Sequence, residues 1–410
     1  TPGYPLPALR APAPSRSPEP RNSRLTPAAR RRPRDDMTDT PLPPRPVPRW
    51  LHWWAVATVV VALALLVLGQ MVTSFRAGMA DPIWPTEPWY LLDNYKDGFG
   101  YLIEHTHRIL GFAVGGFVGV LALGLVATDP RRAARWISVV AVVVLLGAFG
   151  EFHRALIAQR EPGVPIVLPV SIVAVMLAAL AGLLVLAGSG LTARGGVARL
   201  LGLVALVFVM IQGLLGGFRV KLNELVGTDL AAVHGVFGQV TFAVLVAVAV
   251  LTAVPPVEAL AEADRRRMRS RAVGLLGALF VQLMLGAWVR HAPTPLAQRL
   301  HLLVAFVVVA KVVVLLRAVS AARPRVGPWG WALGLFVTVQ VALGVEAWMG
   351  KFGDEARRGT AVALPEAREV SEKQAALRTA HALVGTGVLA AAVGFGLRLG
   401  SRAGRAGDTG

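Results

Sequence analysis

The chain has 410 residues, of which 55% are hydrophobic and 16% are charged, and its mean hydropathy is +0.58. These values exclude an ordinary soluble domain and indicate a polytopic membrane protein. The sequence contains no cysteine, which excludes disulfides, thiolate metal sites and cysteine nucleophiles. The net charge of +18 does not indicate a nucleic-acid partner, because the basic residues occupy an N-terminal segment and short loops without interleaved aromatic residues.

Residues 1–49 precede the first apolar run. They are rich in proline and arginine and show no hydrophobic periodicity, so we predict a disordered N-terminal tail. Met37 is a plausible alternative start, in which case residues 1–36 are upstream sequence rather than functional protein. Residues 401–410 form a second polar tail at the C-terminus.

Ten stretches of the chain are long and apolar enough to cross a bilayer, which requires about 20 predominantly apolar residues. The predicted spans are 51–73, 101–127, 136–158, 165–189, 197–218, 230–253, 271–290, 297–318, 328–349 and 376–399. The first run is too long for a signal peptide and is not followed by a small-residue cleavage site, so we predict an uncleaved span. The predicted fold class is therefore all-α, a polytopic membrane protein of about ten transmembrane helices.

The arginines between the spans predict the orientation. Loops after even-numbered spans are rich in arginine, as in 265–271, whereas loops after odd-numbered spans mix acids and bases, as in 351–373. By the positive-inside rule, the arginine-rich loops and both termini lie in the cytoplasm.

A polar cluster opens the second predicted span, with the sequence Glu104-His105-Thr106-His107-Arg108. Polar and ionisable groups are costly in a bilayer and usually mark function there. Glu104 and His107 are three residues apart, so they share one face of a helix. Glycines follow His107 on the same side at intervals of four, at Gly111, Gly115 and Gly119. A ligand-capable imidazole above bare backbone suits either a large flat ligand or a closely packed neighbouring helix.

An internal repeat places three more histidines in equivalent settings. Three odd-numbered spans carry the same pattern, Gln212-x-x-Leu215-Gly216, Gln282-x-x-Leu285-Gly286 and Gln340-x-x-Leu343-Gly344. Each is followed by a polar loop and then by a span with a histidine near its start, namely His234, His301 and His381. We interpret the glutamine patterns as packing and hydrogen-bonding devices between helices. The topology predicts that all four histidines lie at one end of their helices.

Four imidazoles at one membrane depth predict metal ligation rather than isolated core histidines. Zinc or copper sites favour compact clusters with carboxylates or sulfur, whereas ligands from separate helices above small residues suit the axial ligation of haem. Four histidines make two pairs, which we predict to be His107 with His234 and His301 with His381. The first pair lies in a bundle formed by residues 50–254, and the second lies in a bundle formed by residues 255–400.

The motif Glu104-x-x-His107-Arg108, combined with the three glutamine patterns and their histidines, resembles the haem A synthase family, the CtaA-type haem O oxidases. The resemblance covers about 50–127 and 197–399. It implies a bacterial-type cytoplasmic membrane protein that oxidises the position-8 methyl group of haem O to the formyl group of haem A, for insertion into terminal oxidases. It also implies haem O as the substrate, bound in the first bundle, and haem b in the second.

The resemblance implies a role for each matching residue. His107 and His234 are the expected ligands of the substrate haem, and His301 and His381 are the expected ligands of haem b. Glu104 is the expected catalytic acid, beside the methyl group or as a proton relay. Arg108 is expected to pair with Glu104 or, preferably, with a haem propionate, since those polar groups would emerge at the outer face.

The sequence departs from the family pattern in two ways. Members usually have eight helices, so 136–190 is interpreted as an inserted helix hairpin, which brings Glu151 and His153 near the outer surface. Some members carry cysteine pairs in outer loops, and this chain has none.

Two other functions fit the residues. A bis-histidine membrane cytochrome b would transfer electrons without modifying its haem and would not need Glu104. A transporter or scaffold would use the histidines as protonation sites and would bind no porphyrin. The expected partners are the lipid bilayer, an unidentified electron acceptor and, by analogy with the pathway, the farnesyltransferase that forms haem O.

Overall fold

The computed structural model describes residues 3, 47–159, 167–222, 225, 228–253, 262–292, 294–321, 328–358 and 371–400. Their regular structure is helical throughout, which confirms the predicted all-α fold class. The helices are α1 (Arg49–Ser74), α2 (Pro88–Asp93), α3 (Phe99–Val126), α4 (Arg132–Ile157), α5 (Val170–Ser189), α6 (Gly196–Lys221), α8 (Asp229–Thr252), α9 (Glu262–His291), α10 (Pro295–Ala321), α11 (Pro328–Arg358) and α12 (Glu372–Gly400).

Within the described residues, ten of these helices are long and apolar enough to cross a membrane, as the sequence predicted. The chain is therefore an integral membrane protein. Two helices are longer than expected: α9 begins at Glu262 instead of 271, and α11 continues to Arg358 instead of ending at 349. The added part of α9, residues 262–270, is rich in arginine, which has good helix propensity, whereas the added part of α11, residues 350–358, mixes charged residues with two glycines. They extend the helices into segments that were predicted to be loops.

The first four-helix ring is formed by α1, α3, α6 and α8. The helix α1 packs against α3, α3 against α6, α6 against α8, and α8 closes the ring on α1. The ring encloses apolar residues of all four helices, including Leu51, Leu121, Leu206 and Leu245, each almost fully buried. Since α3 and α8 each pack against both α1 and α6, α3 and α8 occupy one diagonal of the ring and α1 and α6 occupy the other.

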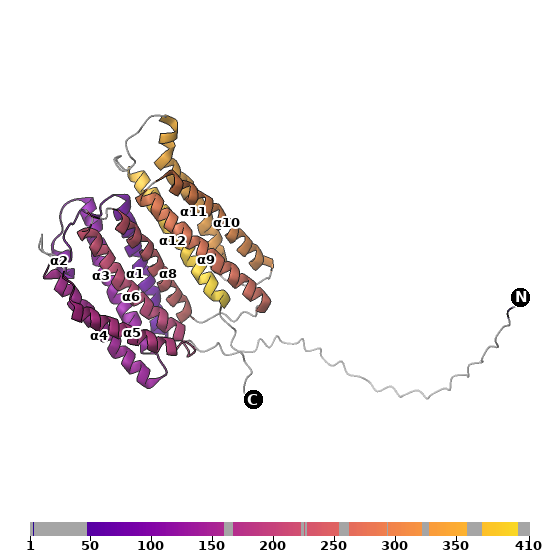
Figure 1. Cartoon of the computed structure of the whole chain (residues 1–410). Helices are drawn as coiled ribbons and strands as arrows, with labels where there is room; N and C mark the ends of the chain where they lie inside the picture. Colours follow the sequence, from indigo (N-terminus) through magenta and orange to yellow (C-terminus); the bar gives the residue numbers. More distant parts are fainter. Residues whose placement is uncertain are drawn as a thin grey trace, which may run out of the picture. The chain divides into compact units, whose positions relative to one another are not determined.

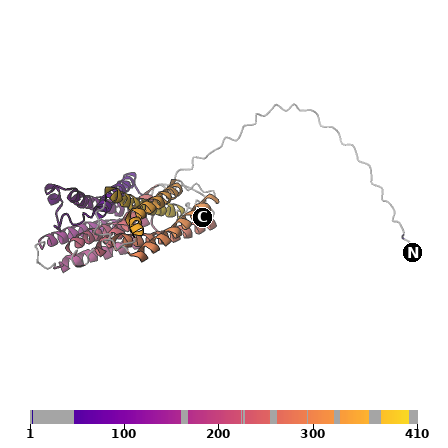
Figure 2. The same cartoon turned by 90° about the horizontal axis from the view of Figure 1, so that it is seen from above.

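The second ring is formed by α9, α10, α11 and α12. The helix α9 packs against α10, α10 against α11, α11 against α12, and α12 against α9. Its core includes Leu275, Leu315, Leu333 and Phe395, none of which is exposed. Here α10 and α12 share one diagonal, and α9 and α11 share the other. The long helices of this half lie side by side in both views (Figures 1 and 2).

The two rings touch along a seam in which α8 packs against α9 and α12, and α1 packs against α12. Buried polar groups cross this seam. The Thr386 hydroxyl of α12 donates to Gln239 Oε1 of α8 at 2.7 Å, and Thr379 Oγ1 of α12 lies 2.9 Å from Ser74 Oγ of α1. Buried polar groups in a membrane protein need such partners, because lipid offers none.

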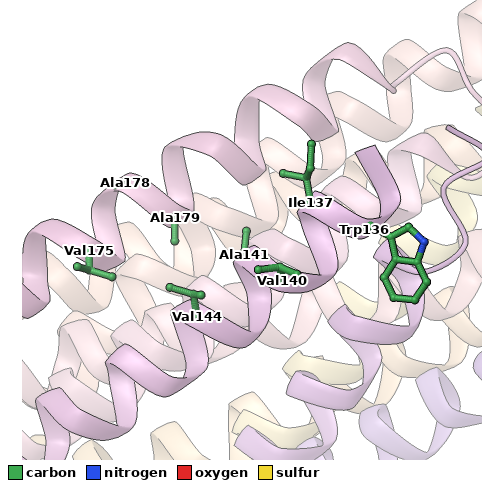
Figure 3. Close-up of a pocket in the computed structure, with 8 residues that line it drawn as sticks. All are labelled: Trp136, Ile137, Val140, Ala141, Val144, Val175, Ala178 and Ala179. Atoms are coloured by element: carbon green, nitrogen blue, oxygen red, sulfur yellow. The ribbon is translucent and has the colours of Figure 1, made fainter. Parts of the chain in front are cut away.

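The helices α4 and α5 lie outside the first ring. They pack against each other, α4 also packs against α3, and α5 also packs against α6. Between them is an open apolar groove lined by Trp136, Ile137, Val140, Ala141, Val144, Val175, Ala178 and Ala179 (Figure 3). The groove contains none of the predicted site residues. It is part of the outer surface of the hairpin rather than a polar ligand site.

An ion-pair cluster fixes the start of this hairpin. Asp129, which is buried, accepts from Arg131 Nη2 at 2.8 Å and lies 3.6 Å from Arg199 Nε at the start of α6. Arg131 also donates to Ser189 Oγ and to the Leu186 carbonyl at the end of α5. The hydrogen bonds from Arg131 lower the pKa of Asp129 below its ordinary value of 3.8. The cluster therefore ties the hairpin to the first ring through charge as well as packing.

Candidate histidine sites in the two bundles

The four predicted ligands lie on the diagonals of the two rings. His107 is on α3 and His234 is on α8 in the first ring, and His301 is on α10 and His381 is on α12 in the second. The rings of His301 and His381 face each other with centroids 6.4 Å apart and planes at 75°. His107 and His234 lie close enough for their charges to interact. The structure thus brings together the two pairs that the repeat predicted.

Each imidazole lies against a glycine on the preceding span of the same ring. A Cβ atom added at that glycine would come within 3.0–3.2 Å of the histidine Cε1 atom. The four contacts are Gly69 with His107, Gly216 with His234, Gly286 with His301, and Gly344 with His381. Because a Cβ contact under 3.4 Å forces a neighbour to shift, the repeated glycine is the residue that lets the ring approach the facing helix.

Each imidazole also faces a backbone carbonyl from the same span. His107 Nδ1 donates to the Leu65 carbonyl at 3.2 Å, four residues before Gly69. The other three histidines have the equivalent carbonyl as their backbone neighbour, from Gln212, Gln282 and Gln340. These three contacts are looser than a standard hydrogen bond, and Nδ1 is buried there without another partner. With Nδ1 turned to a carbonyl, Nε2 is the nitrogen available to a ligand.

The sequence interpretation missed the first member of this repeat. Helix α1 carries Leu65-x-x-Leu68-Gly69, which matches the other three patterns except that leucine replaces glutamine. All four patterns share the leucine and the glycine, whereas only three of them contain the glutamine. A comparison of the residues before each histidine loop for Leu-Gly alone would have found it.

The glutamines of the pattern make hydrogen bonds between helices, as predicted. Gln212 Nε2 donates to the His234 carbonyl at 2.8 Å. In the second ring, Gln282 Nε2 lies 3.3 Å from His301 Nε2, and Gln340 Nε2 lies 3.3 Å from His381 Nε2. The two glutamines of the second ring therefore address the ligand-facing nitrogen, whereas Gln212 addresses only the backbone.

Glu104 is the centre of a buried polar network at the head of α3. It is 3% exposed, its Oε1 lies 3.0 Å from Arg108 Nη2, and its Oε2 accepts from the Asp81 backbone N–H at 2.9 Å. His105, which is fully buried, lies 3.0 Å from Asp81 Oδ2 through Nδ1 and 2.6 Å from the Leu91 carbonyl through Nε2. The network holds the loop between α1 and α3 onto the start of α3.

Arg108 is held by this network. Besides Glu104, its guanidinium lies 3.3 Å from Asp81 Oδ2 and donates to the carbonyls of Asp81 and Ile83. Of the two expected partners, the structure shows Glu104. The loop supplied the competing acceptors, and a loop contact over 25 residues of sequence is not visible in a helical motif.

Arg219 on α6 is the cation that sequence interpretation overlooked. It is half-buried, its guanidinium rests against Gly78, and its charge acts on Glu104, His107 and His234. Within the described residues it has neither an ion pair nor a hydrogen bond to a side chain or the backbone. It lies three residues after Gly216, so its place next to the first histidine pair follows from the repeat.

The inserted hairpin contacts the loop between α1 and α3 near the first site. His153 Nε2 donates to the Thr86 carbonyl at 3.0 Å, and its ring packs edge-on against Phe112 of α3. Glu151 is exposed and pairs with Arg154 at 2.7 Å. His153 therefore steadies the loop between α1 and α3, whereas Glu151 belongs to the surface.

The residues present fit a metal held between paired imidazoles. In the described part of the chain, no three His, Asp or Glu side chains gather into a metal cage. Two imidazoles alone suit a metal whose other ligands come from the group that carries it, as in a porphyrin. Imidazole–metal bonds of about 2.0–2.1 Å would place the ring centres of an axial pair about 6 Å apart, close to the 6.4 Å between His301 and His381.

The glycine ladder below His107 is only partly open. A Cβ atom added at Gly111 or Gly115 would meet nothing within 4 Å, whereas one at Gly119 would touch Leu146 of α4 at 3.7 Å. The upper two glycines thus leave room below the imidazole, and the lowest serves helix packing.

Comparisons with protein-family models, with curated proteins and with solved structures find no match to this chain. The resemblance to haem A synthases therefore stays a prediction carried by the motif residues and their geometry.

Proposed function

We propose that this protein is a haem A synthase, which oxidises the position-8 methyl group of haem O to a formyl group. The observation that carries the proposal is the shared setting of the four histidines. Each lies against a glycine and a backbone carbonyl of the preceding span, and the four are arranged as two diagonal pairs. A histidine that only fills the core does not require a glycine at the same position of the facing helix in every repeat.

Under this proposal, His107 and His234 hold the substrate haem, and His301 and His381 hold haem b. The bound haems supply the redox chemistry of the methyl oxidation. The chain supplies the orientation of the rings: at His107 the Leu65 carbonyl accepts from Nδ1 and so selects the tautomer, and at each histidine the glycine lets the ring lie against the facing helix. The half-buried Arg219 supplies a positive charge beside the first pair, suited to a haem carboxylate.

Glu104 distinguishes the first pair from the second. The residues three before the other histidines are Ala231, Gln298 and Arg378, so only the first histidine has an acid one helical turn away. Arg108 and the Asp81 N–H hold this carboxylate in one orientation. A fixed, buried carboxylate can stabilise positive charge that develops on a neighbouring carbon, or accept a proton from it.

A bis-histidine cytochrome b is the second candidate, and one observation favours it. Both Glu104 oxygens already have protein partners, as expected for a residue that only locks the loop onto α3. In that case the protein would pass electrons through its two haems and leave both unmodified.

Replacement of Glu104 by glutamine separates the two candidates. The amide keeps the size of the side chain, so the loop and both haems should remain. The synthase proposal expects the yield of haem A to fall about a hundredfold in cells that supply haem O, with haem O accumulating. Extracted haems are separated by chromatography, and a pyridine haemochrome spectrum checks that haem is still bound. Glu151→Gln, at an exposed acid, is the matched control.

Two outcomes would overturn the assignment. An undiminished haem A yield in Glu104→Gln would favour the bis-histidine cytochrome b over the synthase. A purified protein without any porphyrin would leave only the transporter reading, in which the histidines serve as protonation sites.

The proposal includes a cellular setting. The haem A synthase reading places the chain in a bacterial-type cytoplasmic membrane with both termini in the cytoplasm. It also expects the farnesyltransferase that forms haem O as a neighbour and a separate electron acceptor.

A further inference from the structure

Two arginines meet at the seam between the bundles, at the end of the second ring that holds its histidines. Arg378 on α12 is three residues before His381, and Arg290 on α9 is four residues after Gly286, the glycine that contacts His301. Arg290 and Arg378 are close enough for their charges to repel, and the charge of Arg290 also reaches His381. Both guanidinium groups are only half-exposed.

The protein partners of these arginines are neutral. Arg290 donates from Nη1 to Gln70 Oε1 at 2.6 Å, and from Nη2 to the Gln70 carbonyl at 2.9 Å and to Ser74 Oγ at 2.8 Å. Arg378 donates from Nη2 to Gln374 Oε1 at 3.3 Å. Among the described residues, neither has a carboxylate partner. Since a guanidinium has five N–H donors, both retain unused ones.

Two other arginines that are shielded from water do have acids, whereas Arg219 resembles Arg290 and Arg378 in having none among the described residues. Arg108 pairs with Glu104 and Asp81, and Arg199 lies 3.6 Å from Asp129. Two neighbouring half-buried cations without an acid repel each other, because the interaction grows as the dielectric falls below that of water. An arrangement of this kind is stabilised when an anion is added between the two charges.

We propose that Arg290 and Arg378 form a carboxylate-binding site for the ligand held between His301 and His381. This inference rests on the proposed function, because it takes the ligand to be a haem that carries propionate groups. Guanidinium groups suit such a ligand, since they bind the two oxygens of a carboxylate in a fixed fork. Arg378, one helical turn from His381, and Arg290, one turn from Gly286, border the second pair from two helices.

The site belongs to both bundles. Arg290 is positioned by Gln70 and Ser74 of α1, and Gln70 directly follows Gly69, the glycine that contacts His107. A carboxylate bound to Arg290 would therefore be linked by one hydrogen bond to Gln70 in the first bundle. Gln70 is the neighbour of Gly69, which contacts His107.

The test compares haem b with its propionate dimethyl ester, which has the same iron and ring but no carboxylates. The full chain carrying His107→Ala and His234→Ala, produced without haem, is titrated with each porphyrin in detergent, and binding is followed by absorption. We expect haem b to bind about ten- to a hundredfold more tightly than the ester, as lost charge-assisted hydrogen bonds imply. Arg378→Gln and Arg290→Lys should reduce that ratio, and Arg317→Gln, at an exposed site on α10, should preserve it.

Each result decides a different claim. If the ester binds as tightly as haem b, or if Arg378→Gln leaves the ratio unchanged, the carboxylate site is wrong while the haem assignment stands. If neither porphyrin binds to the chain with the second pair intact, both the site and the proposed function are wrong. Arg290→Lys keeps the charge that faces Gln70 and Ser74, so it guards against loss of the fold.

Discussion

The two bundles are built from the same parts, yet the second is nearly symmetric and the first is not. In the second, both histidines have a glutamine 3.3 Å from Nε2 and a glycine beneath the ring. In the first, His234 keeps the glutamine and the glycine, whereas His107 has Leu65 in place of the glutamine and gains Glu104 one turn away.

The departures from the repeat lie at one place in the first bundle. The changes concentrate around one imidazole, His107, and replace a neutral amide by a leucine on one helix and add an acid on another. The loop between α1 and α3 then covers that acid, and Arg219 brings a charge to the same place. A pair kept symmetric suits a stable carrier of electrons, and a pair made asymmetric suits a reaction at one side of its ligand.

Removal of one histidine pair should have the largest effect and should distinguish the two bundles most clearly. We expect His301→Ala with His381→Ala to lose about half of the bound haem, because under the proposed function each bundle holds one haem between its own pair of histidines. The remaining haem should be the substrate type, and His107→Ala with His234→Ala should leave haem b instead. The ratio of haem to protein, from pyridine haemochrome spectra, measures the loss. His153→Ala, outside both pairs, should lose none, and equal loss of both haem types from either double variant would contradict separate sites.

Substitution of a ring-contacting glycine should have an intermediate effect. Leucine at Gly286 would collide with His301, whose Cε1 lies 3.2 Å from the added Cβ position, and should weaken haem binding in the second bundle more than tenfold. A Cβ atom added at Gly277 on the same helix would meet nothing within 4 Å, so Gly277→Leu is the matched control. Affinities come from haem titration of each variant. Equal affinities for the two leucine variants would remove the glycine contact from the description of the site.

The smallest effect is expected from the hairpin cluster, which only the first bundle possesses. Asp129→Asn leaves Arg199 buried without its acid and should lower the free energy of unfolding by about 1–3 kcal/mol. Because Arg131 lowers the pKa of Asp129, the carboxylate contribution is complete above the ordinary value of 3.8 and disappears as the pH falls through the lower folded value. The difference between wild type and variant should therefore be constant from pH 5 to 8.

Thermal unfolding in detergent, followed by the loss of each haem, measures this effect. Asn at the exposed Asp93 is a suitable control. A difference that already shrinks between pH 8 and pH 5 would show that another group, not Asp129, carries the stabilisation.

Hydropathy was sufficient for the ten helices, because each span needs an apolar length that soluble helices lack. It did not predict the ends of α9 and α11, since charged residues with good helix propensity continue a helix beyond the membrane without any apolar signal. The helix α2, six residues in the loop before α3, was also not predicted, because its apolar run is far too short to be recognised as a span.

The candidate site was predictable wherever it followed the repeat. The four histidines and the glutamine contacts have fixed spacing, so they were visible in the sequence. Gly69 was missed because its repeat has lost the glutamine, and the partners of Arg108 were missed because Asp81 and Ile83 come from a loop that folds back over α3. Contacts between distant, non-repeated segments leave no periodic trace in one sequence.

The hydroxyl of Ser74 has a further consequence for how this protein can be taken apart. It meets Arg290 and Thr379, one from each of two helices of the other bundle, at 2.8 and 2.9 Å. Separated into independent polypeptides, the halves would leave one guanidinium and two hydroxyls without these partners. A foreign bundle could replace the first half only if it supplied the Ser74 hydroxyl, and the second half only if it supplied the Arg290 guanidinium and the Thr379 hydroxyl, so the two bundles form a single module for protein engineering.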